Sequence, residues 1–237
     1  MCPRTMIRYE EKYLIHACQF DALKKVLSEN MSYDRYSNEG QFYPIFNLYF
    51  DTEDDHVARL SAMHPKFKEK MRLRAYQCPV QSDDFVFLEL KKKIDGHVLK
   101  RRISLTLKEA TALIQDGEEP ILVNEESKQV FREIEYYFRY HLVKPKVFLA
   151  YERLAYTSLS SLRITFDRHI RYRRDSLDFG FCEGKSLIQE GQYLLEIKSC
   201  ENYPLWLVNA LSQLEIHSQS FSKYGVSYQQ YLTEVRS

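Results

Sequence analysis

The sequence predicts a single α+β domain over residues 1–237, with an antiparallel sheet of roughly eight strands and helices packed outside it. Three observations lead to this prediction. Several segments alternate apolar and polar residues with period two, which is typical of half-buried strands. Two segments in the middle of the chain repeat their apolar residues with the spacing of a helix. The 7 glycines and 7 prolines argue against linkers, and no repeat or break in composition divides the chain.

The expected strands follow from this alternation along the chain. They cover residues 7–15, 44–51, 68–76, 146–156, 162–172 and 193–199, with two more in a hairpin at 85–105. The hairpin is expected to turn at Asp95-Gly96, because this dipeptide suits the positive φ angles of a tight turn. The 18 tyrosines and 14 phenylalanines also favour strands.

The expected helices fill stretches between these strands. They cover residues 20–27, 106–115, 126–142, 205–214 and 227–235. Asp51 or Thr52 is expected to cap a further short helix that runs through Val57 and Leu60. Asp116-Gly117 is expected to close the helix that begins at residue 106.

Composition limits the classes of function. The 34 Lys and Arg residues nearly balance the 33 Asp and Glu residues, so a protein that coats nucleic acid is not indicated. The five cysteines are scattered without a CxxC motif, which favours a reduced, cytoplasmic compartment. No window approaches the ~18 apolar residues of a membrane span, and the N-terminus lacks the apolar run of a signal peptide. We therefore expect a cytoplasmic protein without a membrane segment of its own.

The charges on the expected strands are unevenly distributed. Cations recur two residues apart on one strand face, as with Arg72 and Arg74, or Lys100 and Arg102. Like charges that face each other across a sheet repel. One interpretation is a set of solvated outer faces, which are usually polar. The other interpretation is a barrel whose cations point inward and are neutralised by a bound polyanion. Arginine binds phosphate well because its planar group contacts two oxygens, and acidic residues among the cations could bind a divalent metal.

A set of short motifs resembles a known protein family and supports the second interpretation. In chain order they are RYEEKY, NLYFDT, MRLRAY, FLELK, YERLAY, LRITFD, LLEIK and SFSKY. Together they resemble the VTC domain, the catalytic module of the vacuolar transporter chaperone polyphosphate polymerase and its bacterial relatives. The resemblance runs from Arg8 to about Tyr231. This family belongs to the triphosphate tunnel metalloenzymes, so the resemblance implies a closed antiparallel β-barrel, lined by Lys and Arg, that holds Mn²⁺ or Mg²⁺.

The resemblance also implies roles for individual residues. The residues expected to act in catalysis are Lys12, Arg72, Arg74, Lys91, Arg153, Arg163, Lys198 and Lys223. Those expected to bind phosphate or substrate are Arg8, Lys100, Arg102, Tyr151 and Ser222. Glu196 matches the metal-binding glutamate, and Glu10 and Glu89 are further candidates for the metal. Ser220 stands where some polymerases carry a lysine, which is expected to weaken the grip on an emerging chain.

The implied reaction moves the γ-phosphoryl group of ATP to the end of a polyphosphate chain and releases ADP. Lys12, Arg72, Arg74, Lys91, Arg153 and Arg163 would cradle the triphosphate, and Lys198, Ser222 and Lys223 would position the reacting phosphate or the product. The expected partners are therefore ATP and inorganic polyphosphate, with no nucleic acid. A possible membrane-protein partner is unknown. The phosphate-sensing SPX domain and the membrane segments that accompany the vacuolar proteins are not seen in the sequence, which argues against membrane translocation and inositol-phosphate control but not against the tunnel chemistry.

Two other functions fit the same residues. In a tunnel triphosphatase, water would attack inorganic or nucleoside triphosphate, with Glu10 or Glu89 as the acid that positions it. In a binding module, polyphosphate or nucleotide would be held without turnover. The products distinguish the three: long chains, free phosphate, or neither.

Overall fold

The computed structural model describes residues 9–63, 66–94, 97–158 and 161–236. The chain forms two compact units. Unit 1 comprises Met1–Pro44, Tyr151–Ile170 and Ser186–Ser222, and unit 2 comprises Ile45–Ala150, Arg171–Lys185 and Lys223–Ser237. The expectation of one domain over residues 1–237 stays a prediction.

The class is α+β, as the sequence predicts, with an antiparallel sheet of ten strands. The strands pair in the order β1-β10-β8-β7-β3-β4-β5-β6, while β2 pairs with β7 and β9 with β8. Two of these ten strands, β2 (Ser32–Tyr33) and β9 (Lys185–Ser186), are only two residues long and were not expected. Hydrogen bonds between the described strands do not close the sheet, so a closed barrel is not confirmed.

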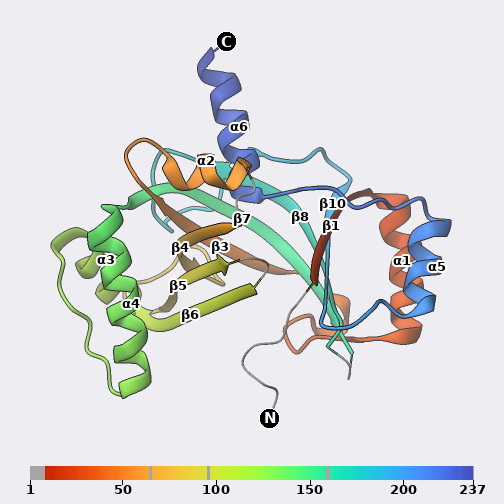
Figure 1. The fold of residues 1–237 in the computed structure, drawn as a ribbon, viewed down its shortest axis with the longest axis horizontal. Coiled ribbons are helices and arrows are strands. Elements are labelled where there is room, and N and C mark those ends of the chain that lie inside the picture. The colour runs from red at the N-terminus through yellow and green to blue at the C-terminus, as the bar shows by residue number, and fades with distance from the viewer. Residues whose placement is uncertain (1–8, 64–65, 95–96, 159–160, 237) are drawn as a thin grey trace. The chain divides into compact units, whose positions relative to one another are not determined.

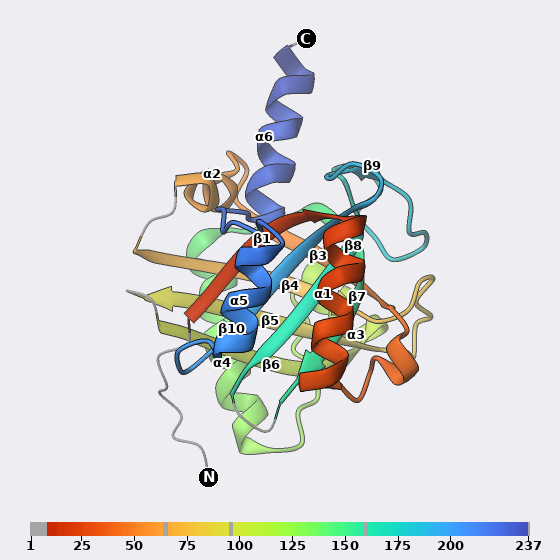
Figure 2. The ribbon, with the colours of Figure 1, turned by 90° about the vertical axis from the view of Figure 1, so that its right-hand side faces the viewer.

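Unit 1 packs two helices on its part of the sheet. Its strands are β1 (Tyr9–His16), β2, β10 (Gln192–Ser199) and parts of β7 (Lys144–Thr157) and β8 (Arg163–Arg173). Helices α1 (Ala17–Asn30) and α5 (Leu205–Gln213) lie side by side over these strands, as Figure 2 shows, and a short 3₁₀ helix, η1, covers Asn38–Gly40. Leu23 of α1 and Leu207 of α5 are fully buried in a core with Phe166 and Leu195.

Unit 2 contains the expected hairpin and most of the helices. Its strands are β4 (Phe67–Ala75), β5 (Phe85–Ile94), β6 (His97–Thr106), most of β3 (Tyr43–Asp51) and the remaining parts of β7 and β8. Its helices are α2 (His56–Met63), α3 (Leu107–Asp116), α4 (Glu125–His141) and α6 (Lys223–Arg236). Helices α3 and α4 cover one side of the hairpin (Figure 1).

Local signals in the sequence explain where the helices of unit 2 begin and end. Thr106 caps α3 in a reciprocal capping box with Glu109, and Gly117 ends this helix with a φ of 72°. On the hairpin, Ile94 pairs with His97, while the predicted turn residues Asp95 and Gly96 lie outside the described residues.

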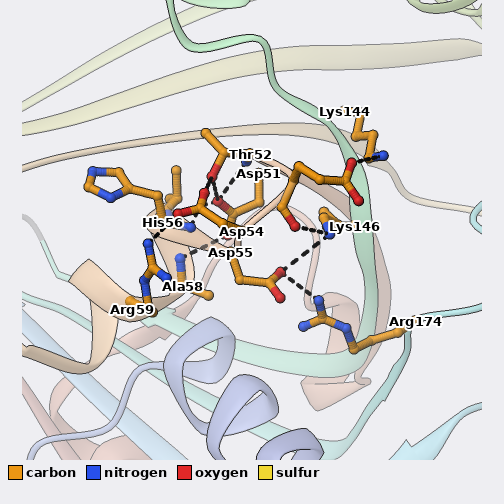
Figure 3. Close-up of polar contacts among 12 residues, drawn as sticks. Asp51, Thr52, Asp54, Asp55, His56, Ala58, Arg59, Lys144, Lys146 and Arg174 are labelled. Carbon is orange, nitrogen blue, oxygen red and sulfur yellow. Dashed lines mark hydrogen bonds and ion pairs between the residues drawn. The ribbon is translucent and has the colours of Figure 1, made fainter.

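The predicted cap of the short helix α2 is also present. The buried carboxylate of Asp51 accepts hydrogen bonds from the backbone nitrogens of Val57 and Ala58, each at 2.8 Å (Figure 3). Thr52 Oγ1 accepts another from the backbone nitrogen of His56 at 3.0 Å. Both candidate residues therefore satisfy N–H groups in the first turn of α2, which have no partner within the helix.

Candidate functional site

The three paired strands β4, β5 and β6 of unit 2 have two chemically different faces. Met71, Leu73, Leu88 and Leu90 are buried and form part of the core. The residues that alternate with them on β4, β5 and β6 are mostly charged, and they include Lys70, Arg72, Arg74, Glu89, Lys91, Lys100 and Arg102. We call these seven residues the cation face. Period-two alternation separates them from the core residues, because successive strand side chains point to opposite sides.

Glu89 is the centre of the cation face. Strand register places it opposite Arg72 on one side and Arg102 on the other. Its side chain is only 1% exposed. Arg72 Nη2 lies 2.7 Å from Glu89 Oε2, and Lys100 Nζ lies 2.6 Å from Oε1. Arg74 and Arg102 approach the same carboxylate at 3.9 and 3.8 Å, so four cations share one acid.

This arrangement fixes the protonation state of Glu89. Burial alone would raise the pKa of the carboxyl, but the charges of Arg72, Arg74 and Lys100 overcome it and lower the pKa to about 2. Desolvation and the two neighbouring arginines lower the pKa of Lys100, although Glu89 acts in the opposite direction. The carboxylate is therefore ionised at neutral pH, and the positive charge around it exceeds what it can neutralise.

Strand β3 holds two of these arginines in place. Asn47 is buried; its Oδ1 accepts from Arg74 Nε at 2.9 Å, and its Nδ2 donates to the carbonyl of Leu149 at 3.1 Å. Tyr49 accepts a hydrogen bond from Arg72 Nη1 at 3.0 Å. Both guanidinium groups are thus oriented before any ligand arrives, which lowers the entropy lost on binding.

The cations on the opposite face of the hairpin are arranged differently. Lys92 pairs with Glu69 at 2.9 Å, and Arg101 pairs with Glu133 of α4 at 3.2 Å. Each of these two cations has an acidic partner of its own. Lys92 and Arg101 thus each pair with a different acid, whereas the four cations around Glu89 share one carboxylate.

Unit 1 contains a second group of predicted residues, on β1 and β10. Strand register places Lys12 opposite Glu196, and Glu10 opposite Lys198. Lys12 Nζ lies 3.1 Å from Glu10 and 3.9 Å from Glu196. Lys198 lies 3.7 Å from Glu10 and also pairs with Glu196. Two carboxylates and two ammonium groups thus alternate around one small area of the sheet.

The predicted arginines of unit 1 lie in ion pairs that the sequence did not assign. Arg153 makes a two-pronged contact with the fully buried Asp167, at 2.6 and 2.8 Å. Burial opposes the charge of Arg153, but the nearby Asp167 raises its pKa above the ordinary value. The guanidinium also lies over the ring of Tyr151, with 5.3 Å to the centroid. Arg163 pairs with Asp34 at 2.9 Å.

For the remaining predicted residues, the structure gives the position in the fold and the degree of burial. Lys91 is half-buried on β5. Ser222 and Lys223 are half-buried where α6 begins. Arg8 lies outside the described residues. The structure therefore brings together Arg72, Arg74, Lys100 and Arg102 around Glu89 in unit 2, and Lys12, Lys198, Glu10 and Glu196 in unit 1.

The sequence analysis missed the residues that orient these groups. Asn47 and Tyr49 lie within the NLYFDT motif, and Asp167 ends LRITFD, yet none was assigned a role. A polar Asn in a strand that is otherwise apolar was the available signal, since a buried amide needs partners. Asp34 lies outside the motifs, and no feature of the sequence around it indicated that it would pair with Arg163.

The carboxylates differ in how well they suit a divalent metal. No group of three or more His, Cys, Asp or Glu side chains within the described ranges is arranged to hold a metal ion. Glu10 and Glu196 are two carboxylates, the number that commonly acts with substrate phosphates on magnesium, but each is ion-paired with Lys12 and Lys198, and their assignment to the metal stays a prediction. Glu89 faces four cations instead, and its assignment to the metal stays a prediction.

Comparison with solved structures defines the class of fold. A putative adenylate cyclase from Bacillus halodurans matches with a TM-score of 0.54 and 16% identity, covering 92% of this chain and 95% of that one. A putative adenylyl cyclase from Hippeastrum, described as having a dominant triphosphatase activity, matches with a TM-score of 0.52 and 15% identity. This match covers 93% of this chain and 95% of that one. Similarity at this level of identity establishes the fold.

Comparison with family models identifies the family within that fold. The model of the VTC domain matches residues 7–232, almost the whole chain. The chain therefore belongs to the VTC domain family. No curated protein sequence matches it significantly. Among the described helices, none has both the length and the apolar character required to cross a lipid bilayer.

Proposed function

We propose that this protein is a polyphosphate polymerase that transfers the γ-phosphoryl group of ATP to a growing inorganic polyphosphate chain. The observation that carries the proposal is the cation face, where four cations surround the single carboxylate of Glu89. An excess of oriented cations suits a triphosphate, whose charge is spread over several oxygens. Membership of the VTC domain family supports the same substrate class.

The proposed reaction needs little covalent chemistry from the protein. A terminal oxygen of the polyphosphate chain attacks the γ-phosphorus of ATP, the bond to the bridging oxygen breaks, and ADP leaves with the electron pair. The attacking oxygen is already ionised, so no side chain has to remove a proton. Catalysis then depends on alignment and on neutralising the charge of the phosphates.

The roles of the residues follow from their surroundings. Arg72 and Arg74, oriented by Tyr49 and Asn47, would contact the triphosphate, as would Lys91, Lys100 and Arg102. Lys12, Arg153, Arg163, Tyr151 and Lys198 are proposed to contact phosphate from unit 1, and Ser222 and Lys223 to position reacting phosphate or product. Glu10 and Glu196 would hold Mn²⁺ or Mg²⁺. Such an ion, when bound, neutralises charge on the phosphate oxygens.

The test is to incubate the purified protein with ATP and Mn²⁺, separate the products on a gel, and quantify ADP and free phosphate. We expect polyphosphate ladders with ADP and little free phosphate. Arg72→Ala should lower the rate by about 30- to 1000-fold, because a charge-assisted contact in the transition state is worth ~2–4 kcal/mol.

Matched controls lie close in the structure. Arg101→Ala removes an arginine from the opposite face of strands β4, β5 and β6, and Glu190→Gln neutralises an exposed acid of unit 1. Both should retain activity, whereas Glu196→Gln should abolish the ladders. Normal ladders from Arg72→Ala or Glu196→Gln would contradict the proposed roles.

A triphosphatase is the second candidate, supported by the fold shared with the Hippeastrum protein. Water would then be the acceptor, and Glu10, 3.1 Å from Lys12, is the acid proposed to orient it. Free phosphate without ladders would establish this function. Binding of ATP or polyphosphate with neither product would indicate a binding module.

A further inference from the structure

One end of the cation face is aromatic. On β5, period two places Phe85 and Phe87 on the same side as Glu89 and Lys91. Strand register sets Phe87 opposite Arg74 of β4, and Tyr76 follows directly after that strand ends. The rings of Tyr76 and Phe87 meet edge to face, with 5.7 Å between centroids and 66° between planes.

These three rings are not used in the core of unit 2. None of them belongs to its buried hydrophobic cluster. Phe85 is 67% exposed and Tyr76 is 40% exposed, and Phe87 is half-buried. A single exposed aromatic side chain is ordinary, but three that gather at one end of a charged face form a surface suited to a flat, apolar group.

Arg102 joins the aromatic surface to the cation face. Its guanidinium carbon lies 3.5 Å from the centroid of the Phe87 ring, and its Nε lies 3.8 Å from Glu89 Oε1. The guanidinium therefore lies over the ring in a cation–π contact while it stays within the charged group. The aromatic and cationic parts thus form one continuous surface within unit 2.

We propose that Tyr76, Phe85, Phe87 and Arg102 form a stacking surface for the nucleobase of a nucleoside triphosphate. This inference rests on the proposed function and identifies the substrate class of the same site. The strand from Phe87 to Lys91 extends about 13 Å, at ~3.3 Å per residue. When the base of a nucleotide stacks on the aromatic end, its phosphate groups would therefore lie beside the cations farther along the strand. An inorganic triphosphate has no group that uses the aromatic end.

The surface recognises the face of a base and not its edge. Stacking on aromatic and arginine side chains tolerates any base, because every base has a π face. We therefore expect ATP and GTP to bind alike, with larger purines favoured over pyrimidines.

The experiment compares ATP with inorganic triphosphate, titrated separately by calorimetry into the wild-type protein and its variants. Phe87→Leu and Tyr76→Leu remove a ring and keep apolar volume. Each should weaken ATP binding about tenfold, which corresponds to ~1.4 kcal/mol, and leave the affinity for inorganic triphosphate within about twofold. Phe67→Leu is the control, since this exposed ring lies at the other end of β4.

The remaining outcomes separate this inference from the proposed function. If the variants weaken both ligands equally, the rings act only by supporting Arg102, and the inference is wrong while the phosphate site stands. Unchanged ATP binding by both variants, with the wild-type protein still binding inorganic triphosphate, would also overturn the inference alone. A wild-type protein that binds neither ligand would overturn both proposals.

Discussion

At the scale of single residues, Glu89 organises the cation face. Its carboxylate lies within 4 Å of Arg72, Arg74, Lys100 and Arg102 and so offsets part of the repulsion among these four cations. Removing one partner from a buried charged group is costly because the remaining charges are left uncompensated. The positive charge of these cations would also attract phosphate. Glu89 therefore has a structural role, because it stabilises the cations, and a functional role, because it keeps them together at the proposed phosphate site.

Glu89→Gln should therefore lower the free energy of unfolding by about 3 kcal/mol at pH 7. The folded pKa of Glu89, about 2, lies below its ordinary value of 4.5. The ionised carboxylate thus contributes stability above pH 4.5, and this contribution is lost as pH falls toward 2. Urea unfolding of both proteins between pH 3 and 7 should show their difference narrowing at low pH.

The control for this measurement is Glu118→Gln, which neutralises an exposed acid of the same unit. It should leave the stability curve within about 0.5 kcal/mol of the wild type. Inorganic triphosphate should restore part of the stability of Glu89→Gln, because the ligand supplies negative charge to the folded state. A difference between wild type and Glu89→Gln that is constant with pH would mean that Glu89 is not held ionised by its neighbours.

At the scale of elements, Asp51 connects two helices of unit 2. It caps α2 through Val57 and Ala58, and its Oδ2 accepts a hydrogen bond from the hydroxyl of Tyr224 in α6 at 2.6 Å. The ring of Tyr224 stacks on Tyr49, with 4.8 Å between centroids. The first turn of α6, which begins with Lys223, is thereby fixed against β3 and α2.

Tyr224→Phe should loosen both helices together, since it keeps the stacked ring and removes only the hydroxyl. The loss of a hydrogen bond to a buried carboxylate should cost about 1–3 kcal/mol. Hydrogen exchange should become faster in α2 and α6 and remain unchanged in α3. Tyr231→Phe is the matched control, because this ring packs on Arg174 at 4.2 Å. Equal exchange in the two variants would show that the hydroxyl of Tyr224 does not connect the helices.

The elements themselves were largely predictable from local signals. Period-two alternation identified the long strands, and the caps at Asp51 and Gly117 were found in advance because capping depends on neighbouring residues. Strands β2 and β9 were missed because two residues are too few for a period to appear. Strand alternation also placed the cations of β4, β5 and β6 on shared faces before the structure was known.

At the scale of the whole chain, prediction from the sequence was less complete. The partners of Arg153 and Arg163, namely Asp167 and Asp34, depend on contacts between distant segments that periodicity does not reveal. Closure of the sheet also depends on such pairing, and hydrogen bonds among the described strands do not supply it. The family, by contrast, was found from motifs in chain order and is confirmed over residues 7–232. The cytoplasmic location stays a prediction.

The most direct test of this account is the binding of inorganic triphosphate, measured by calorimetry at two salt concentrations. The wild-type protein should bind it, and more weakly at higher salt, because the contacts are charged. Arg72→Ala should weaken binding by at least about tenfold, while Arg101→Ala, on the opposite face of the same three strands, should bind like the wild type. Equal effects of the two substitutions would contradict the claim that the cation face is the triphosphate site.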